Sequence, residues 1–163
     1  MYKSVSFILL TFLLIMGLSS CGTTRVAPVQ KADDSGAGIQ AEVVNTAYDY
    51  LGSRYRYGST GPRSFDCSGL VYFIYNQHDV SLGRTTSQQA QSGRRISVKQ
   101  AAPGDLVFFG KGRKMQHVGV VVSHQNGKLK MIHSSTSRGV VVEEVYSSPY
   151  WSQRLKFAVR VLG

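Results

Sequence analysis

Cys67 is the residue of this sequence best placed to act as a nucleophile. It lies in the segment DCSGLVYFIYN, where apolar residues follow it at positions +3, +4, +7 and +8, the spacing of one buried helix face. The cysteine therefore occupies the first turn of that helix, where the helix dipole and unpaired backbone N–H groups stabilise a thiolate. We therefore expect the thiol of Cys67 to have a lowered pKa. The alternative is that Cys67 is a small buried hydrophobic residue without a chemical role.

A nucleophilic cysteine needs a base, and the chain has four histidines. His117 and His133 fall in predicted strands, whereas His78 ends the helix of Cys67, about 16 Å from its start at 1.5 Å per residue, and is too far away. A cysteine followed much later by a histidine is the order of a papain-like thiol site. A metal site made of Cys67, His117 and His133 is a second possibility, but it lacks a closely spaced pair of ligands.

The turn between the strands of His117 and His133 decides whether the two rings share a face. The dipeptide at 126–127, Asn-Gly, marks this turn. A regular two-residue turn would put the rings on opposite faces, whereas a three-residue loop at 125–127 or a β-bulge would make them diagonal neighbours about 7 Å apart at Cβ. We therefore expect an odd loop or a bulge, with His133 orienting His117 and His124 at the surface.

The elements around these residues predict an α+β fold. Residues 41–51 have helical spacing, Asp66 suits the N-cap of the next helix, and a short helix is expected at 86–91. After Pro103 come β-branched and aromatic runs separated by Gly, Asn or Ser, which predict about five strands. Helices first and strands second predict N-terminal helices packed on one side of an antiparallel sheet.

Residues 1–20 have the pattern of an export signal. A basic start is followed by a 7–18 apolar run, shorter than the roughly 20 residues of a permanent membrane span. The segment LSSC at 18–21 resembles the lipobox of bacterial lipoproteins, whose cysteine, here Cys21, is lipidated; an ordinary signal peptide with a chance cysteine is the alternative. Gly22 resembles the sorting signal for the outer membrane, so we expect the mature chain to face the periplasm from that membrane.

Residues 21–40 are small, polar and aperiodic, which predicts a flexible tether, and residues 41–163 are enough for one domain. The formal charge is +10, and removal of the signal takes away only Lys3 and leaves +9. Export would exclude nucleic acid as a partner and leave phospholipid headgroups and the carboxylate-bearing cell wall; a solvated basic surface with no partner is the alternative. With Cys21 lipidated, Cys67 would have no disulfide partner.

Seven short motifs in order resemble the NlpC family of bacterial cell-wall endopeptidases, and most closely its Spr-type lipoproteins. Each motif is weak alone, but the ordered set spans the domain. They are YRYG at 55–58, DCSGLV at 66–71, RTT at 84–86, PGDLVF at 103–108, HVG at 117–119, IHSS at 132–135 and PYW at 149–151.

The resemblance implies a papain-like α+β fold and hydrolysis of the γ-D-glutamyl-diaminopimelate bond of peptidoglycan stem peptides. It implies that Cys67 is the nucleophile, His117 the base and His133 the residue that orients the base. Tyr55 and Asp66 would shape the site, including the part that binds the N-terminal end of the substrate.

Further expectations complete this interpretation. The backbone N–H of Ser68, at the helix start, would help to bind an oxyanion. Ser59 stands where the family usually has a second glycine, and the 117–133 segment is a few residues longer than in Spr-type relatives. We expect a monomer without cofactor or metal; the alternative function is a catalytically inactive cell-wall-binding lipoprotein of the same fold.

The lipobox generates a first prediction. Cys21→Ser removes the sulfur that would carry the lipid, so the protein should be left unprocessed or soluble while the catalytic domain still works. Membrane fractionation followed by immunoblotting measures this. Unchanged sedimentation of Cys21→Ser with the membranes would contradict the lipid anchor.

Overall fold

The computed structural model describes residues 35–163, so the predicted signal, Cys21 and most of the predicted tether lie outside the described residues. Helix α1 spans Ser35–Asp49 and begins six residues before the expected start at Ala41. Two glycines in its first turn hide this start, because glycine disfavours helix. The extension is held by the domain, since Gln40 donates a 3.1 Å hydrogen bond to the carbonyl oxygen of Leu162.

Helix α2 spans Cys67–Asn76 and begins where the sequence predicts. Its N-cap is Asp66, whose carboxylate accepts a 2.6 Å hydrogen bond from the backbone N–H of Gly69. The predicted apolar stripe is fully buried and consists of Leu70, Val71, Ile74 and Tyr75. The N-cap and the stripe together fix the position of Cys67 at the first residue of the helix.

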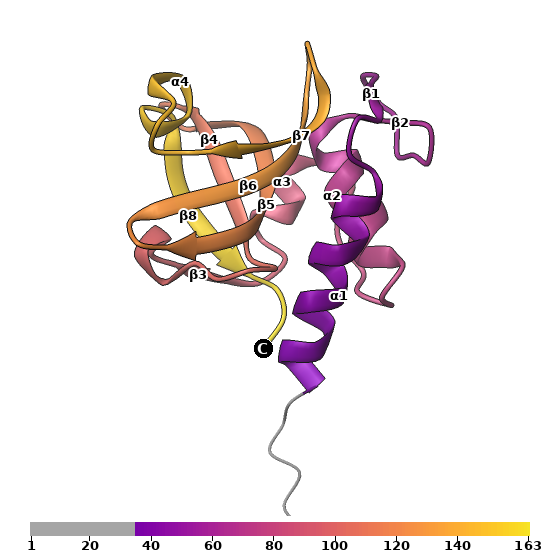
Figure 1. The fold of residues 1–163 in the computed structure, drawn as a ribbon, viewed down its shortest axis with the longest axis horizontal. Helices are drawn as coiled ribbons and strands as arrows, with labels where there is room; N and C mark the ends of the chain where they lie inside the picture. The colour runs from indigo at the N-terminus through magenta and orange to yellow at the C-terminus, as the bar shows by residue number, and fades with distance from the viewer. Residues whose placement is uncertain (1–34) are drawn as a thin grey trace, which may run out of the picture. The chain divides into compact units, whose positions relative to one another are not determined.

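A six-stranded antiparallel sheet forms the other half of the domain, in the order β3-β8-β4-β5-β6-β7 (Figure 1). This confirms the predicted α+β fold with one strand more than expected. The additional strand, β3, has only three residues, two of them exposed arginines, so it lacks an apolar signal. The strands are β3 (Arg94–Ile96), β4 (Leu106–Lys111), β5 (Lys114–Gln125), β6 (Lys128–Ser135), β7 (Gly139–Glu144) and β8 (Leu155–Arg160).

Smaller elements complete the fold. The short helix α3 confirms the prediction at 86–91, and two-residue strands β1 and β2 pair in parallel beside the start of α2. None of the described helices is both long and apolar enough to cross a membrane. These elements are α3 (Thr86–Gln89), α4 (Pro149–Ser152), β1 (Arg54–Tyr55), β2 (Ser64–Phe65) and a 3₁₀ turn (Val98–Gln100).

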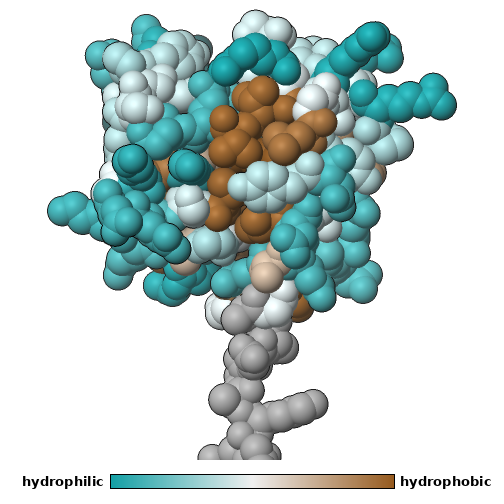
Figure 2. Space-filling model, in the orientation of Figure 1, coloured by the Kyte–Doolittle hydropathy of each residue, from teal (hydrophilic) through white to brown (hydrophobic). Residues whose placement is uncertain are grey.

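The sheet has a hydrophobic core on each face. Helices α1 and α2 cover one face, where their apolar side chains pack on alternate residues of β5 such as Val118 and Val120. The other face carries a second core that contains Phe109, Met131 and Trp151. Of these three residues, Trp151 comes from α4. Figure 2 shows an apolar patch on the side where α1 lies beside the sheet, surrounded by hydrophilic side chains.

The β5–β6 hairpin contains the predicted irregularity, in the form of a bulge. The turn itself is two residues long, with positive φ at Asn126 and Gly127, and Gln125 pairs with Lys128. Between Val121 and Ser123 the register shifts by one residue, so the next pairs are Val121 with Met131 and Val120 with Ile132. The three-residue loop is therefore absent from this hairpin, and the bulge produces the same shift.

Two glycines with the same backbone conformation generate a prediction about stability. Gly139 and Gly127 have φ of 70° and 71°, but a Cβ at Gly139 would overlap the carbonyl oxygen of Ser53, whereas one at Gly127 meets nothing within 4 Å. Gly127→Ala should cost about 1 kcal/mol of unfolding free energy from backbone strain. Gly139→Ala should cost about 3 kcal/mol, because the overlap adds to the strain. Urea unfolding measures both, and equal losses would contradict a close approach at Gly139.

Candidate active site

Cys67 lies half-buried at the N-terminus of α2. Its Sγ is 4.0 Å from the hydroxyl oxygen of Thr86, and the backbone N–H groups of Ser68 and Val118 also donate to the thiol. Burial raises the pKa of Cys67, the charge of Asp66 adds to the rise, and the hydrogen bonds offset only part of it. The lowered pKa expected from the helix N-terminus is therefore wrong, and the thiol is protonated at neutral pH.

His117 and His133 meet as the register argument predicts. His117 Nε2 lies 2.9 Å from His133 Nδ1, and the ring centroids are 4.9 Å apart. Burial, together with the neighbouring ring of His133, lowers the pKa of His117 to about 3, and burial likewise lowers the pKa of His133. Both imidazoles are therefore neutral at neutral pH. Among the described residues, no hydrogen bond joins His117 to the thiol of Cys67.

The other two histidines lie away from this pair. The Nδ1 of His124 is 2.9 Å from the carbonyl oxygen of Ala101, in a half-buried position near the hairpin tip. His78 follows α2 and contacts α1, with its Nε2 2.9 Å from the hydroxyl oxygen of Thr46. Neither ring contacts His117.

The structure adds Glu143, on β7, which the sequence analysis missed. Its Oε2 lies 2.6 Å from His133 Nε2, and its Oε1 forms an ion pair with Arg138 at 2.7 Å. A signal for it existed in the register: Val141 pairs with His133, so the residue two positions further on β7 is a diagonal neighbour of His133.

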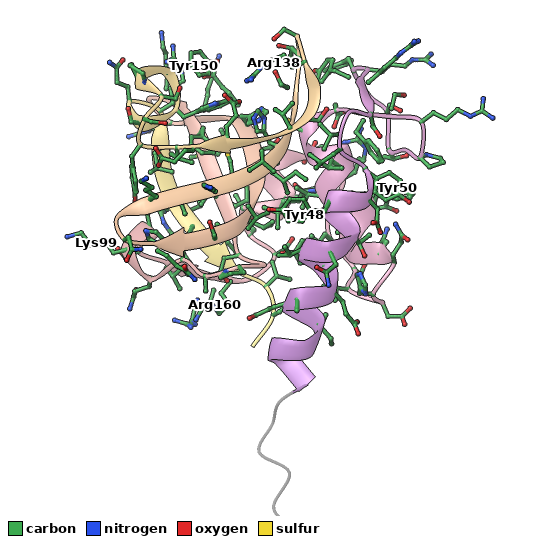
Figure 3. All side chains as sticks on the ribbon, in the orientation of Figure 1. Tyr48, Tyr50, Lys99, Arg138, Tyr150 and Arg160 are labelled. Atoms are coloured by element: carbon green, nitrogen blue, oxygen red, sulfur yellow. The ribbon has the colours of Figure 1, made fainter. Side chains whose placement is uncertain are left out.

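Trp151 covers both imidazoles. Its ring centroid lies 4.8 Å from that of His117 and 5.0 Å from that of His133, and its Nε1 donates a 3.1 Å hydrogen bond to Glu143 Oε2. Beside His117, a cavity of about 530 Å³ is lined by Trp151, Arg138 and Tyr150, and Figure 3 shows the last two at the same end of the sheet. Cys67 does not line this cavity.

A second polar cluster surrounds Asp66, the residue directly before Cys67. Arg84 binds the Asp66 carboxylate through two bonds of 2.6 and 3.1 Å and also donates to the hydroxyl of Ser68. Burial alone would raise the pKa of Asp66, but Arg84 and the backbone N–H groups of Gly69 and Gly58 hold it below its usual range. Asp66 is therefore ionised, and Arg84 is a site residue that the sequence analysis quoted only within a motif.

Tyr55 lies near the thiol, on β1. Burial raises the pKa of its hydroxyl, and the charges of Cys67 and Asp66 contribute to the rise. Ser59 does not project into the site, because its hydroxyl donates a 2.7 Å hydrogen bond to the carbonyl oxygen of Ser64 within the loop. In the described part of the chain, no three His, Cys, Asp or Glu side chains are grouped so as to hold a metal ion.

The neutral thiol and imidazole generate a prediction about reactivity. With Cys67 as the single thiol in a Cys21→Ser background, the rate of iodoacetamide alkylation should rise continuously above pH 8, since the thiol pKa lies above its ordinary value of 9.0. His117→Ala should leave this profile unchanged. A rate plateau that begins below pH 7 and disappears in His117→Ala would instead reveal a preformed thiolate-imidazolium pair.

Comparison with known proteins places the chain in a family. The model of the NlpC/P60 family matches residues 52–160. The murein DD-endopeptidase MepS/murein LD-carboxypeptidase of Escherichia coli K12 is 34% identical, and the match covers 77% of this chain and 64% of that protein. The gamma-DL-glutamyl hydrolase of Bacillus subtilis 168 is 33% identical over 75% of this chain and 30% of its own length.

A solved structure agrees with these matches. The crystal structure of the NlpC/p60 domain of the peptidoglycan hydrolase SagA superposes with a TM-score of 0.65 at 32% identity, covering 74% of this chain and 97% of that one. The resemblance inferred from the seven motifs is confirmed. The chain belongs to the NlpC/P60 family.

Proposed function

We propose that this chain is a cysteine endopeptidase that cuts peptidoglycan stem peptides, with Cys67 as nucleophile, His117 as base and His133 as the residue that orients the base. The 2.9 Å contact between the two imidazoles carries the proposal. Moving two imidazoles from water into the protein interior costs free energy, and apolar side chains at the same positions would avoid that cost. An inactive wall-binding module would have no use for the two imidazoles.

The neutral ground state supports a mechanism in which proton transfer accompanies attack. Cys67 Sγ forms a bond to the carbonyl carbon of the stem peptide while His117 takes the thiol proton, and the carbonyl oxygen becomes an oxyanion that the Ser68 backbone N–H at the start of α2 can bind. His117 then gives the proton to the leaving amine, and a thioester remains. Water, deprotonated by His117, hydrolyses the thioester and restores the thiol.

The bond that we propose is the one between γ-D-glutamyl and diaminopimelate. The ionised carboxylate of Asp66 and the hydroxyl of Tyr55 lie near the thiol, where they suit the free amino end of a short stem peptide. The name of the B. subtilis relative favours a γ-glutamyl bond, whereas the name of the E. coli relative favours a DD or an LD bond. The DD-endopeptidase and LD-carboxypeptidase activities are therefore the competing assignments.

We further propose that the chain is a monomeric lipoprotein held at the outer membrane through Cys21, facing the periplasm. The lipobox and the tether support this, and the positive charge suits a carboxylate-rich wall. Because α1 starts at Ser35, the tether would be shorter than the 21–40 segment.

Digestion of purified muropeptides tests both the chemistry and the bond. Cys67→Ala and His117→Ala should each reduce release to below a few per cent of the parent rate with an unchanged fold, because nucleophile and base act as one unit. Three defined substrates should be offered, with a γ-D-glutamyl bond, a DD cross-link or a C-terminal LD bond, and the products weighed by mass spectrometry. Cleavage of the first is expected.

Each other outcome has a defined meaning. Release by Cys67→Ala near the parent rate would overturn the thiol mechanism, and inhibition by a chelator would point to a metal site instead. Binding of muropeptides without turnover by the parent protein would identify an inactive binding module. Cleavage of only the DD or LD substrate would keep the peptidase and change the bond.

A further inference from the structure

The carboxylate of Glu143 ends a chain of hydrogen bonds that begins at His117. His117 Nε2 is 2.9 Å from His133 Nδ1, and His133 Nε2 is 2.6 Å from Glu143 Oε2. The carboxylate is fixed on both oxygens, because Trp151 Nε1 donates to Oε2 at 3.1 Å and Arg138 to Oε1 at 2.7 Å. Groups from three other elements, β6, α4 and the β6–β7 turn, therefore converge on this carboxylate of β7.

The positions of the ring protons follow from this chain. Burial would raise the pKa of Glu143, but the bonds from Arg138 and His133 hold it below its ordinary value, so Glu143 is ionised and only accepts. His133 must then carry its proton on Nε2. Because neutral His133 has one ring proton, its Nδ1 is bare and accepts from His117 Nε2. Neutral His117 is therefore left with a bare Nδ1, the form that can take a proton from a thiol.

We propose that Glu143 is a positioning residue that fixes the tautomers of both imidazoles and leaves Nδ1 of His117 free to accept the proton of Cys67. This inference rests on the proposed function of Cys67 and His117. Glu143 touches neither of them and acts through His133. Its charge also stabilises the imidazolium that forms when the thiol proton is transferred.

The surroundings of Glu143 favour a role as a positioning residue over a role as one member of a surface ion pair. Its side chain is only 19% exposed, and the side chain of His133 is completely buried, whereas the side chain of Arg138 is 56% exposed. Trp151 is 9% exposed and shields the pair of rings from water. An exposed ion pair contributes little, but a carboxylate in this shielded position keeps its influence on the ring protons.

The neighbouring Glu144 provides a matched control on the same strand. It accepts bonds of 2.9 and 2.6 Å from the backbone N–H groups of Tyr146 and Ser147 and contacts neither histidine. Glu144→Gln removes the same charge from β7 and keeps one of the two acceptor oxygens, and because neither histidine is touched it should leave turnover unchanged.

The experiment combines kinetics with ¹⁵N NMR of the histidine rings in the unliganded full-length protein. Glu143→Leu removes both acceptor and charge, and it should lower kcat about 10- to 100-fold with KM within about twofold, below the full contribution of a general base. In this variant, the ring nitrogens of His117 and His133 should show a mixture of the two neutral tautomers. Glu143→Gln keeps an acceptor oxygen, so it should keep the tautomers and lose less of kcat.

Several results would overturn the proposal. One is parent kcat in Glu143→Leu; another is a loss of kcat with both tautomers unchanged. If Glu143→Leu does not fold, Glu143→Asp takes its place, since the shorter side chain keeps the charge but cannot reach His133, and unchanged tautomers there would equally contradict the role. Should the parent protein release no peptide, the proposed function fails, while the NMR spectra of the unliganded protein still decide whether Glu143 sets the tautomers.

Discussion

The hydrogen bond between His117 and His133 depends on one residue that has no partner in the β5–β6 ladder. Side chains alternate across a strand, so a hairpin with this two-residue turn and no irregularity would turn the two rings to opposite faces. The bulge between Val121 and Ser123 shifts the register by one and brings them together. The same shift puts His133 opposite the small Gly119, where an added Cβ would crowd Met131, the carbonyl oxygen of Ile132 and the Cβ of His133.

The protonation of Cys67 shows which of two opposing effects is larger. A helix N-terminus stabilises a negative charge by roughly 0.3–1 kcal/mol, which is less than one pKa unit. Burial of the sulfur works in the opposite direction, and so does Asp66, the residue that caps the helix. The N-cap that places the thiol therefore also discourages its ionisation. Arg84, bound to Asp66, limits this penalty because it neutralises the carboxylate next to the thiol.

Patterns of period and spacing predicted the parts of the site that depend on local geometry. The apolar stripe after Cys67 located the start of α2, and the pairing arithmetic of the hairpin selected His133 rather than His124. What the sequence could not provide depends on long-range packing: the burial that reverses the expected pKa shift of Cys67, and the approach of Arg84 to Asp66. Strand β3 was missed because three residues with two exposed arginines carry no alternation, and the first turn of α1 because its glycines disfavour helix.

The tip of the β5–β6 hairpin is a suitable place to attach a probe to this protein. Asn126 and Gly127 are exposed, and they lie about 30 Å along the strand from His117 at 3.3 Å per residue. The bulge lies between the tip and the two rings. On the histidine side of the bulge, β4 and β7 flank the paired strands β5 and β6 and hold them in place. A peptide epitope or a fluorophore inserted at the tip would therefore report where the protein is in the cell without altering the candidate site at the other end of the hairpin.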